Sequence, residues 1–128
     1  MARSPEEAHA LVPSLLELTD EAVEVRAELT ESVRGSLDVR PADLKALEAR
    51  FADLLDRIGE LDVELKGWAP LLVDVVVDLG DREVLFCWLE GDRDLSWYHE
   101  IDHGFAGRRP LDHLVPPGSP GSPGSPGA

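Results

Sequence analysis

Three of the four histidines lie in one short polar segment, WYHEIDHGFAGRRPLDH, at residues 97–113. Its metal-ligating side chains are two imidazoles and two carboxylates: His99, Glu100, Asp102 and His103. These groups are ligands for divalent metals such as zinc, so a turn that brings them together would make a metal site. The histidines are four residues apart, but a glycine follows and no helix is indicated. The alternative is that His99 caps the edge of the core while His103 is exposed.

The segment continues as GFAGRR, residues 104–109, which joins two glycines to a pair of arginines. Glycines permit a tight turn that exposes backbone N–H groups, and arginine binds phosphate or carboxylate in bidentate fashion. The pattern therefore predicts a site for a small anion, formed by Gly104, Gly107 and Arg108, with Asp74 reaching in from a neighbouring strand. It matches neither a Walker loop nor a dinucleotide fingerprint. The alternative is that Arg108 pairs with an acid of its own chain.

The single cysteine, Cys87, excludes an internal disulfide. A catalytic thiol needs a base and some exposure. Cys87 is predicted in the middle of a central strand, and no histidine is predicted beside it. The chain therefore shows no complete catalytic constellation, which favours a binding protein over an enzyme.

The segment LLVDVVVDLGDREVLFCWLEGDRDLSWYHE, residues 71–100, is expected to position these side chains. β-Branched and aromatic runs alternate with Gly80-Asp81 and Gly91-Asp92, which are typical of two-residue hairpin turns. The pattern predicts a three-stranded antiparallel β-meander, which together with the polar loop that follows it occupies residues 70–112.

The two turns also predict which side chains share a face of the sheet. The second turn pairs Phe86 with Trp97 and Val84 with His99. One face is nearly all apolar and is expected to pack on helices: Val73, Val75, Val77, Val84, Phe86, Trp88, Leu95 and Trp97. The other carries a row of small polar residues, Asp74, Cys87 and Ser96. A slip of one residue in either turn would exchange the faces.

The N-terminal half has the period of helices. Ser4-Pro5-Glu6-Glu7 is typical of a helix start, and apolar residues then recur at steps of three and four: Leu11, Leu15, Leu18, Ala22, Val25 and Leu29. A second seam follows Pro41: Leu44, Leu47, Phe51, Leu54, Ile58 and Leu61. Two such seams predict a long antiparallel helical hairpin over residues 5–64. Their apolar flanks favour a homodimer.

The chain ends in a Gly-Ser-Pro repeat, which predicts a disordered tail over residues 115–128. The rest, residues 1–114, is expected to be a single α+β domain: the hairpin packed on the meander.

Composition narrows the class of partner. The chain has 128 residues, 26 acids and 12 bases, for a net charge of −14. Such a charge disfavours nucleic acids and anionic membranes. Acids and a proline interrupt the N-terminal apolar run that a signal peptide needs. We therefore expect a cytoplasmic protein.

Residues near the candidate site resemble a known signature. LVD at 72–74, REVLFCWLEGD at 82–92 and WYHEIDHGFAGRRPL at 97–111 are similar to a small bacterial family called domain of unknown function 2203. The matching residues are Leu72, Val73, Asp74, Cys87, Trp88, Gly91, His99, Gly104, Phe105, Ala106, Gly107 and Arg108. Tyr98 and Asp92 depart from that pattern. The resemblance implies a bacterial cytosolic protein and no particular activity.

Together these observations predict a non-enzymatic binding or interaction protein that acts as a homodimer. A small enzyme that depends on a metal or binds an anion, with its site at residues 97–113, is the alternative. The sequence does not decide whether a divalent metal is a cofactor.

Overall fold

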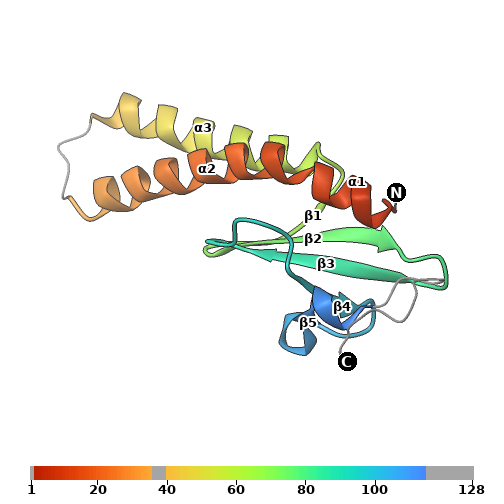
Figure 1. Cartoon of the computed structure of the whole chain (residues 1–128). Helices are drawn as coiled ribbons and strands as arrows, with labels where there is room; N and C mark the ends of the chain where they lie inside the picture. Colours follow the sequence, from red (N-terminus) through yellow and green to blue (C-terminus); the bar gives the residue numbers. More distant parts are fainter. Residues whose placement is uncertain (1, 36–39, 115–128) are drawn as a thin grey trace. The chain divides into compact units, whose positions relative to one another are not determined.

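The computed structural model describes residues 2–35 and 40–114. Helices and an antiparallel sheet make an α+β protein, as predicted (Figure 1). No helix of the described chain is long and apolar enough to cross a membrane. The predicted tail at 115–128 lies outside the described residues.

The described residues form two compact units. One runs from Pro13 to Val63 and holds nearly all of α2 (Val12–Val33) and the whole of α3 (Pro41–Gly59). The other combines the residues up to Val12 with those from Glu64 onward, and it holds α1 (Pro5–Ala10) and the sheet. That residues 1–114 act as a single domain stays a prediction.

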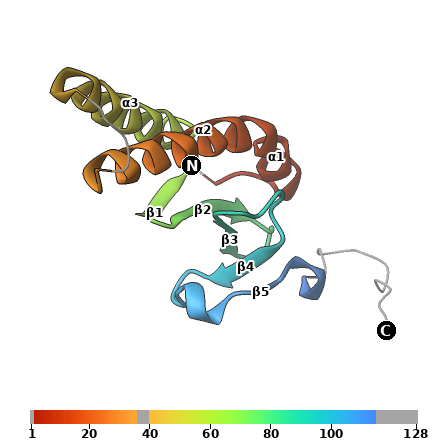
Figure 2. The same cartoon turned by 90° about the vertical axis from the view of Figure 1, so that its left-hand side faces the viewer.

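In the helical unit, α2 and α3 lie side by side (Figures 1 and 2). An ion pair joins Arg50 of α3 to Glu21 of α2. Both predicted seams contribute buried residues: Leu15, Ala22, Val25, Leu54 and Ile58. Thr19 is also buried, and its hydroxyl is satisfied there because it donates to the Leu15 carbonyl 2.8 Å away. That the helices form an antiparallel hairpin packed on the sheet stays a prediction.

The predicted first helix is divided in two. Ser4 caps α1 with a complete capping box, in which its hydroxyl accepts from the Glu7 N–H and the Glu7 carboxylate accepts from the Ser4 N–H. Helix α1 ends at Ala10, and α2 begins at Val12, immediately before Pro13. A proline has no N–H and its ring collides with the carbonyl four residues earlier. The helix therefore breaks at Leu11.

The prediction of three strands is wrong, because the sheet has five in the order β1-β2-β3-β4-β5. They are β1 (Glu64–Trp68), β2 (Leu71–Asp78), β3 (Glu83–Leu89), β4 (Trp97–Glu100) and β5 (Arg109–Pro110), and every neighbouring pair is antiparallel. The missed strands are both at the edges. The β1 sequence ELKGW has little apolar content and an irregular register at Gly67, and β5 has only two residues, one a proline.

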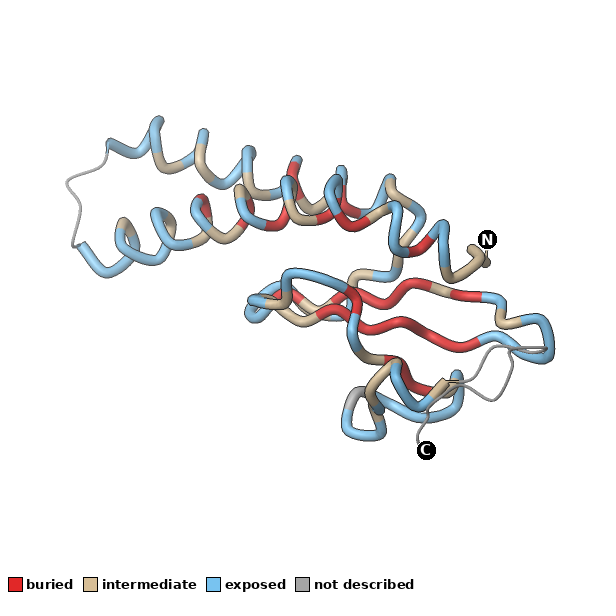
Figure 3. The backbone as a smooth tube through the Cα atoms, in the orientation of Figure 1, coloured by how far each residue is buried: buried red, intermediate tan, exposed pale blue. Residues whose placement is uncertain are grey.

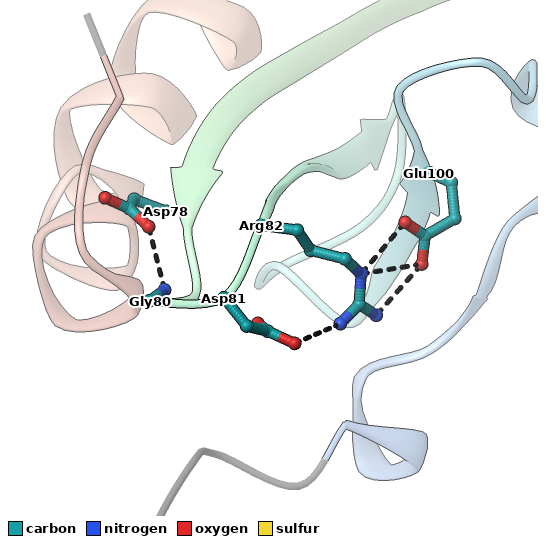
Figure 4. Close-up of polar contacts among 5 residues, drawn as sticks. All are labelled: Asp78, Gly80, Asp81, Arg82 and Glu100. Carbon is teal, nitrogen blue, oxygen red and sulfur yellow. Dashed lines mark hydrogen bonds and ion pairs between the residues drawn. The ribbon is translucent and has the colours of Figure 1, made fainter.

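The β2–β3 register is confirmed. Val73, Val75 and Val77 pair with Trp88, Phe86 and Val84. The Leu79 N–H donates to the Arg82 carbonyl at 2.9 Å, so Gly80 and Asp81 form the two-residue turn. Gly80 has φ +100° and its N–H donates to the Asp78 carboxylate (Figure 4). A positive φ is the conformation this turn requires of glycine.

The β3–β4 register is shifted by one residue from the prediction. Phe86 pairs with Tyr98 rather than Trp97, and Leu85 rather than Val84 pairs with His99. The turn is centred one residue earlier, because the Asp92 N–H donates to the Leu89 carbonyl, and the chain stays unpaired until Trp97. One residue of shift exchanges the faces. Trp97 and His99 therefore share a face with Asp74 and Cys87.

The predicted apolar face of β2 and β3 is the core of this unit. Its six side chains are at most 2% exposed (Figure 3): Val73, Val75, Val77, Val84, Phe86 and Trp88. Tyr98 takes the place predicted for Trp97. Helix α1 contacts β2, and the His9 ring meets the Phe86 ring edge to face.

Candidate functional site

The opposite face of the sheet holds a buried polar pair. His99 Nε2 lies 3.2 Å from Asp74 Oδ2, and each residue is 4% exposed. The sequence predicted both as site residues, but the predicted register placed His99 on the face opposite to Asp74. The shifted β4 register brings them to one face.

The two side chains meet above the central strand. Asp74 is on β2 and His99 on β4, while β3 lies between them. Neighbouring strands are about 4.8 Å apart, so the pair spans roughly twice that distance. Asp74 pairs in register with Cys87 of β3. A small side chain at this position leaves room for the imidazole and the carboxylate to approach.

The hydrogen bonds of His99 constrain where its protons lie. Nδ1 is 2.9 Å from the Glu100 carbonyl oxygen, which can only accept, so Nδ1 carries a proton. Nε2 faces a carboxylate oxygen, and a hydrogen bond there needs one further proton, on Nε2 or on the carboxyl. The hydrogen bond between Nε2 and Oδ2 therefore links the two residues in the interior of the fold.

Lys66 of β1 extends this pair toward the edge of the sheet. Its Nζ lies 3.8 Å from Asp74 Oδ2 and 3.2 Å from the Glu64 carboxylate. The other Asp74 oxygen, Oδ1, is buried and has no hydrogen-bond partner among the described residues. Sequence reasoning missed Lys66, because it lies in the strand that the pattern did not indicate.

Cys87 is fully buried beside the pair. Burial raises the pKa of its thiol to about 12, and the negative charge of Asp74 adds to the shift, whereas Arg108 opposes it. Only the thiolate is a nucleophile. The structure thus supports the expectation that Cys87 is chemically inert at neutral pH.

The predicted anion-binding residues line a hollow at the loop between β4 and β5. This open hollow has a volume of about 550 Å³ and is formed by His103, Gly104, Ala106, Gly107, Arg108 and Arg109. The Arg108 guanidinium stacks over the Trp97 ring, 4.5 Å from the ring centre. Stacking fixes the plane of the guanidinium and uses its face rather than its N–H edge. The predicted partner Asp74 lies at the other side of Cys87 and does not line the hollow.

The four predicted metal ligands do not gather at one point. His99 is buried against Asp74, while Glu100 points to the other face and binds Arg82 through both carboxylate oxygens (Figure 4). His103 lines the hollow, and Asp102 is exposed. No group of three His, Cys, Asp or Glu side chains within residues 2–35 and 40–114 is placed to hold a metal ion. A metal site stays a prediction, and the geometry supports the anion site better.

The basic residues around the hollow create a positive electrostatic potential, which extends to Glu100. Hydrogen bonds from Arg82 are the main cause that lowers the pKa of Glu100. Desolvation opposes them, and the charge of Arg82 adds to the lowering. The charges of His103 and Arg109 add to the lowering. Arg109 therefore places a positive charge near the loop, although the whole chain carries a net charge of −14.

A second concavity was not indicated by the sequence. It lies on the apolar face of the sheet and has a volume of about 360 Å³. Its walls come from α1, the β2–β3 turn, the sheet and the residues after β5, including His9, Phe86, Tyr98 and Leu111. No local pattern could have found it, because its walls are far apart in the sequence.

Comparison with known proteins identifies a family of similar proteins. A family model described as an uncharacterized conserved protein, DUF2203, matches residues 3–111. Neither a curated protein nor a solved structure matches the chain significantly.

Proposed function

The chain belongs to the DUF2203 family of uncharacterised conserved proteins, and we propose that it binds a small anion, a phosphate or a carboxylate, in the hollow of residues 103–109. The observation that carries this proposal is that three basic residues, His103, Arg108 and Arg109, line one hollow. Among the residues that the structure describes, no carboxylate lines this hollow. Arginine donors suit planar or tetrahedral oxyanions.

Both ends of the loop are fixed by the sheet, which supports a preorganised site. The loop leaves β4 at Glu100 and returns in β5, where Arg109 pairs with Tyr98. The Leu111 N–H also donates to the Ser96 carbonyl at 2.9 Å. A loop that is ordered before binding loses less conformational entropy when the ligand arrives.

The Asp74–His99 pair has a positioning role in this proposal. It ties β4 to β2 across the central strand, at the end from which the loop departs. Trp97 of the same strand carries the stacked guanidinium of Arg108. The pair therefore supports the strand on which the arginine rests, without contacting the ligand.

Binding is favoured over catalysis because of the nature of the nearby groups. The candidate nucleophile Cys87 is buried and its pKa is raised to about 12. The hollow itself is lined by arginine, histidine, alanine and glycine residues. These groups hold an anion but include no hydroxyl, thiol or carboxylate.

The test is a titration of the full chain with inorganic phosphate and with citrate, followed by calorimetry and by melting temperature. A ligand at about a hundred times its Kd stabilises by about 2.7 kcal/mol. We expect saturable binding that Arg108→Ala and Arg109→Ala each weaken by about tenfold or more. Arg108→Lys should recover only part of the loss, since lysine cannot bind an oxyanion in bidentate fashion.

The matched control is Arg34→Ala, which removes an exposed arginine of the helical unit and changes the net charge equally. It should bind phosphate as the unmodified chain does. If no anion binds, or if Arg34→Ala weakens binding as much as Arg109→Ala does, the proposal is wrong. Arg109 is exposed, so its variant is informative even if Arg108→Ala does not fold.

Self-association is a second candidate function, and exposed apolar side chains favour it. Trp68 is 57% exposed and lies in β1, an edge strand of the sheet. An edge strand presents unpaired backbone groups, and an exposed tryptophan adds apolar area. A second copy of the chain that pairs along β1 would cover both. This supports the predicted homodimer.

A further inference from the structure

We propose that the concavity on the apolar face of the sheet is a second binding site, which takes a small uncharged aromatic molecule. It is separate from the anion hollow, because the two concavities have no lining residue in common. All its lining residues belong to one compact unit. This inference does not rest on the proposed anion binding.

The size of the cavity argues for a ligand rather than a packing defect. This cavity has about 360 Å³. Ligand pockets begin at roughly 300 Å³, so the volume fits a molecule of about one or two fused rings.

The walls argue for an aromatic ligand. Phe86 and Tyr98 form the sheet side and are 2% and 4% exposed, so their rings are held in place. His9 of α1 packs edge to face on Phe86, with ring centres 6.1 Å apart and planes at 73°. Leu79, Leu111 and Leu114 supply aliphatic walls. Aromatic rings favour edge-to-face and offset partners of their own kind.

The charges argue for an uncharged ligand. Arg82 lines the cavity, but its guanidinium donates to the Glu100 carboxylate at 3.0 Å and to Asp81 at 3.2 Å (Figure 4). These two carboxylates neutralise the positive charge of Arg82, so an anionic ligand would gain little from this arginine. An ammonium group would have to compete with Arg82 for the same carboxylates. A neutral molecule avoids both costs.

Polar recognition would come from imidazole. His9 Nδ1 lies 3.0 Å from the Pro5 carbonyl, so this nitrogen carries the proton. Nε2 lies 4.0 Å from an Asp94 oxygen, beyond hydrogen-bond distance. His113 also lines the cavity. A ring N–H or hydroxyl on the ligand can therefore bond to an imidazole nitrogen while the ring packs on the leucine walls.

The experiment titrates the full chain with indole and 2-naphthol and follows the methyl resonances of Leu79, Leu111 and Leu114 by NMR. Saturable shifts of these methyl groups are expected. Leu111→Trp should fill the cavity and weaken binding of both probes by about tenfold or more. Leu89→Trp is the matched control, since Leu89 is a half-buried leucine on the other face of the sheet, and it should bind as the unmodified chain does.

Further measurements test whether the two sites bind independently of each other. Arg108→Ala should keep indole binding, and Leu114→Trp should keep phosphate binding. Indole-3-acetate should bind more weakly than indole, because Arg82 is already matched. Absence of saturable methyl shifts up to about 1 mM probe, or equal binding by Leu111→Trp and the unmodified chain, would overturn the proposal. Leu114→Trp serves the same purpose if Leu111→Trp does not fold.

Discussion

Among single residues, the buried pair of Asp74 and His99 makes the largest demand on the fold. Removing a carboxylate and an imidazole from water is unfavourable unless each finds a partner. Each supplies the other's partner, and the Glu100 carbonyl completes the bonding of His99. The pair therefore stabilises one arrangement of β2 and β4 and penalises others.

We expect Asp74→Ala to lower the free energy of unfolding by about 1–3 kcal/mol, because His99 would stay buried without its partner. Urea denaturation measures this change. Asp112→Ala, which removes an exposed aspartate of the same unit, should change it by less than about 0.5 kcal/mol. In a double-mutant cycle Asp74→Ala and His99→Ala should be strongly non-additive. Additive effects would contradict direct coupling of the two side chains.

The raised pKa of Cys87 predicts a loss of stability at alkaline pH. In the unfolded chain the thiol titrates near pH 8.5, whereas in the folded protein its pKa is about 12. Between these values the folded state holds a proton that the unfolded state has lost, so the free energy of unfolding falls as pH rises. Cys87→Ala should show a shallower fall over this range in urea denaturation.

The same burial predicts slow alkylation of Cys87 by iodoacetamide at neutral pH, and rapid alkylation in urea. In the urea experiment, all other titratable groups are the same in the unmodified chain and in Cys87→Ala. The difference between the two slopes of the free energy of unfolding against pH therefore isolates the thiol. Equal slopes, or alkylation of the folded protein at the rate of an exposed thiol, would show that Cys87 is accessible.

At the level of elements, the connection between β3 and β4 decides the composition of both faces of the sheet. Asp92 organises it: its carboxylate accepts from the Leu89 N–H at 3.0 Å, and its carbonyl accepts from the Trp88 indole at 2.9 Å. Gly91 lies in this turn with φ +103°. The turn therefore closes before β4 begins, and β4 enters the sheet in a register that the turn alone does not set.

Gly91→Ala tests the importance of this backbone conformation. Nothing lies within 4 Å of a Cβ atom at Gly91, so the cost comes from its positive φ alone. We expect a loss of about 1–2 kcal/mol in the free energy of unfolding. Gly104→Ala is the matched control, because its Cβ also meets open space and its φ lies outside the left-handed region. Comparable losses in urea denaturation of both variants would show that φ at Gly91 is not the cause.

At the scale of the whole molecule, the exposed apolar residues favour self-association. We expect light scattering at micromolar concentration to show a dimer. Trp68→Ser should shift the protein toward the monomer and leave its secondary structure unchanged, because Trp68 is 57% exposed. Val33→Ser, at an apolar residue that is 78% exposed in the helical unit, is the control and should leave the dimer intact. If the unmodified chain is a strict monomer, the prediction of a homodimer is wrong.

Local sequence chemistry by itself determined several parts of the protein: the capped start of α1, the two long helices, the Gly80-Asp81 turn and the β2–β3 register. In each case the residues that decide the structure are a few positions apart. It also placed three of the four anion-binding candidates, Gly104, Gly107 and Arg108, in one loop, and their lining of one hollow follows from that closeness.

Only the tertiary structure decided the register of β4, the two edge strands, the contact of His99 with Asp74 and the cavity beside Phe86. A pattern of period two says which residues of a strand share a face, but not which face meets a neighbour across a connection longer than a tight turn. That choice depends on burial summed over side chains distant in the sequence. His99 and Asp74, 25 residues apart, meet for this reason.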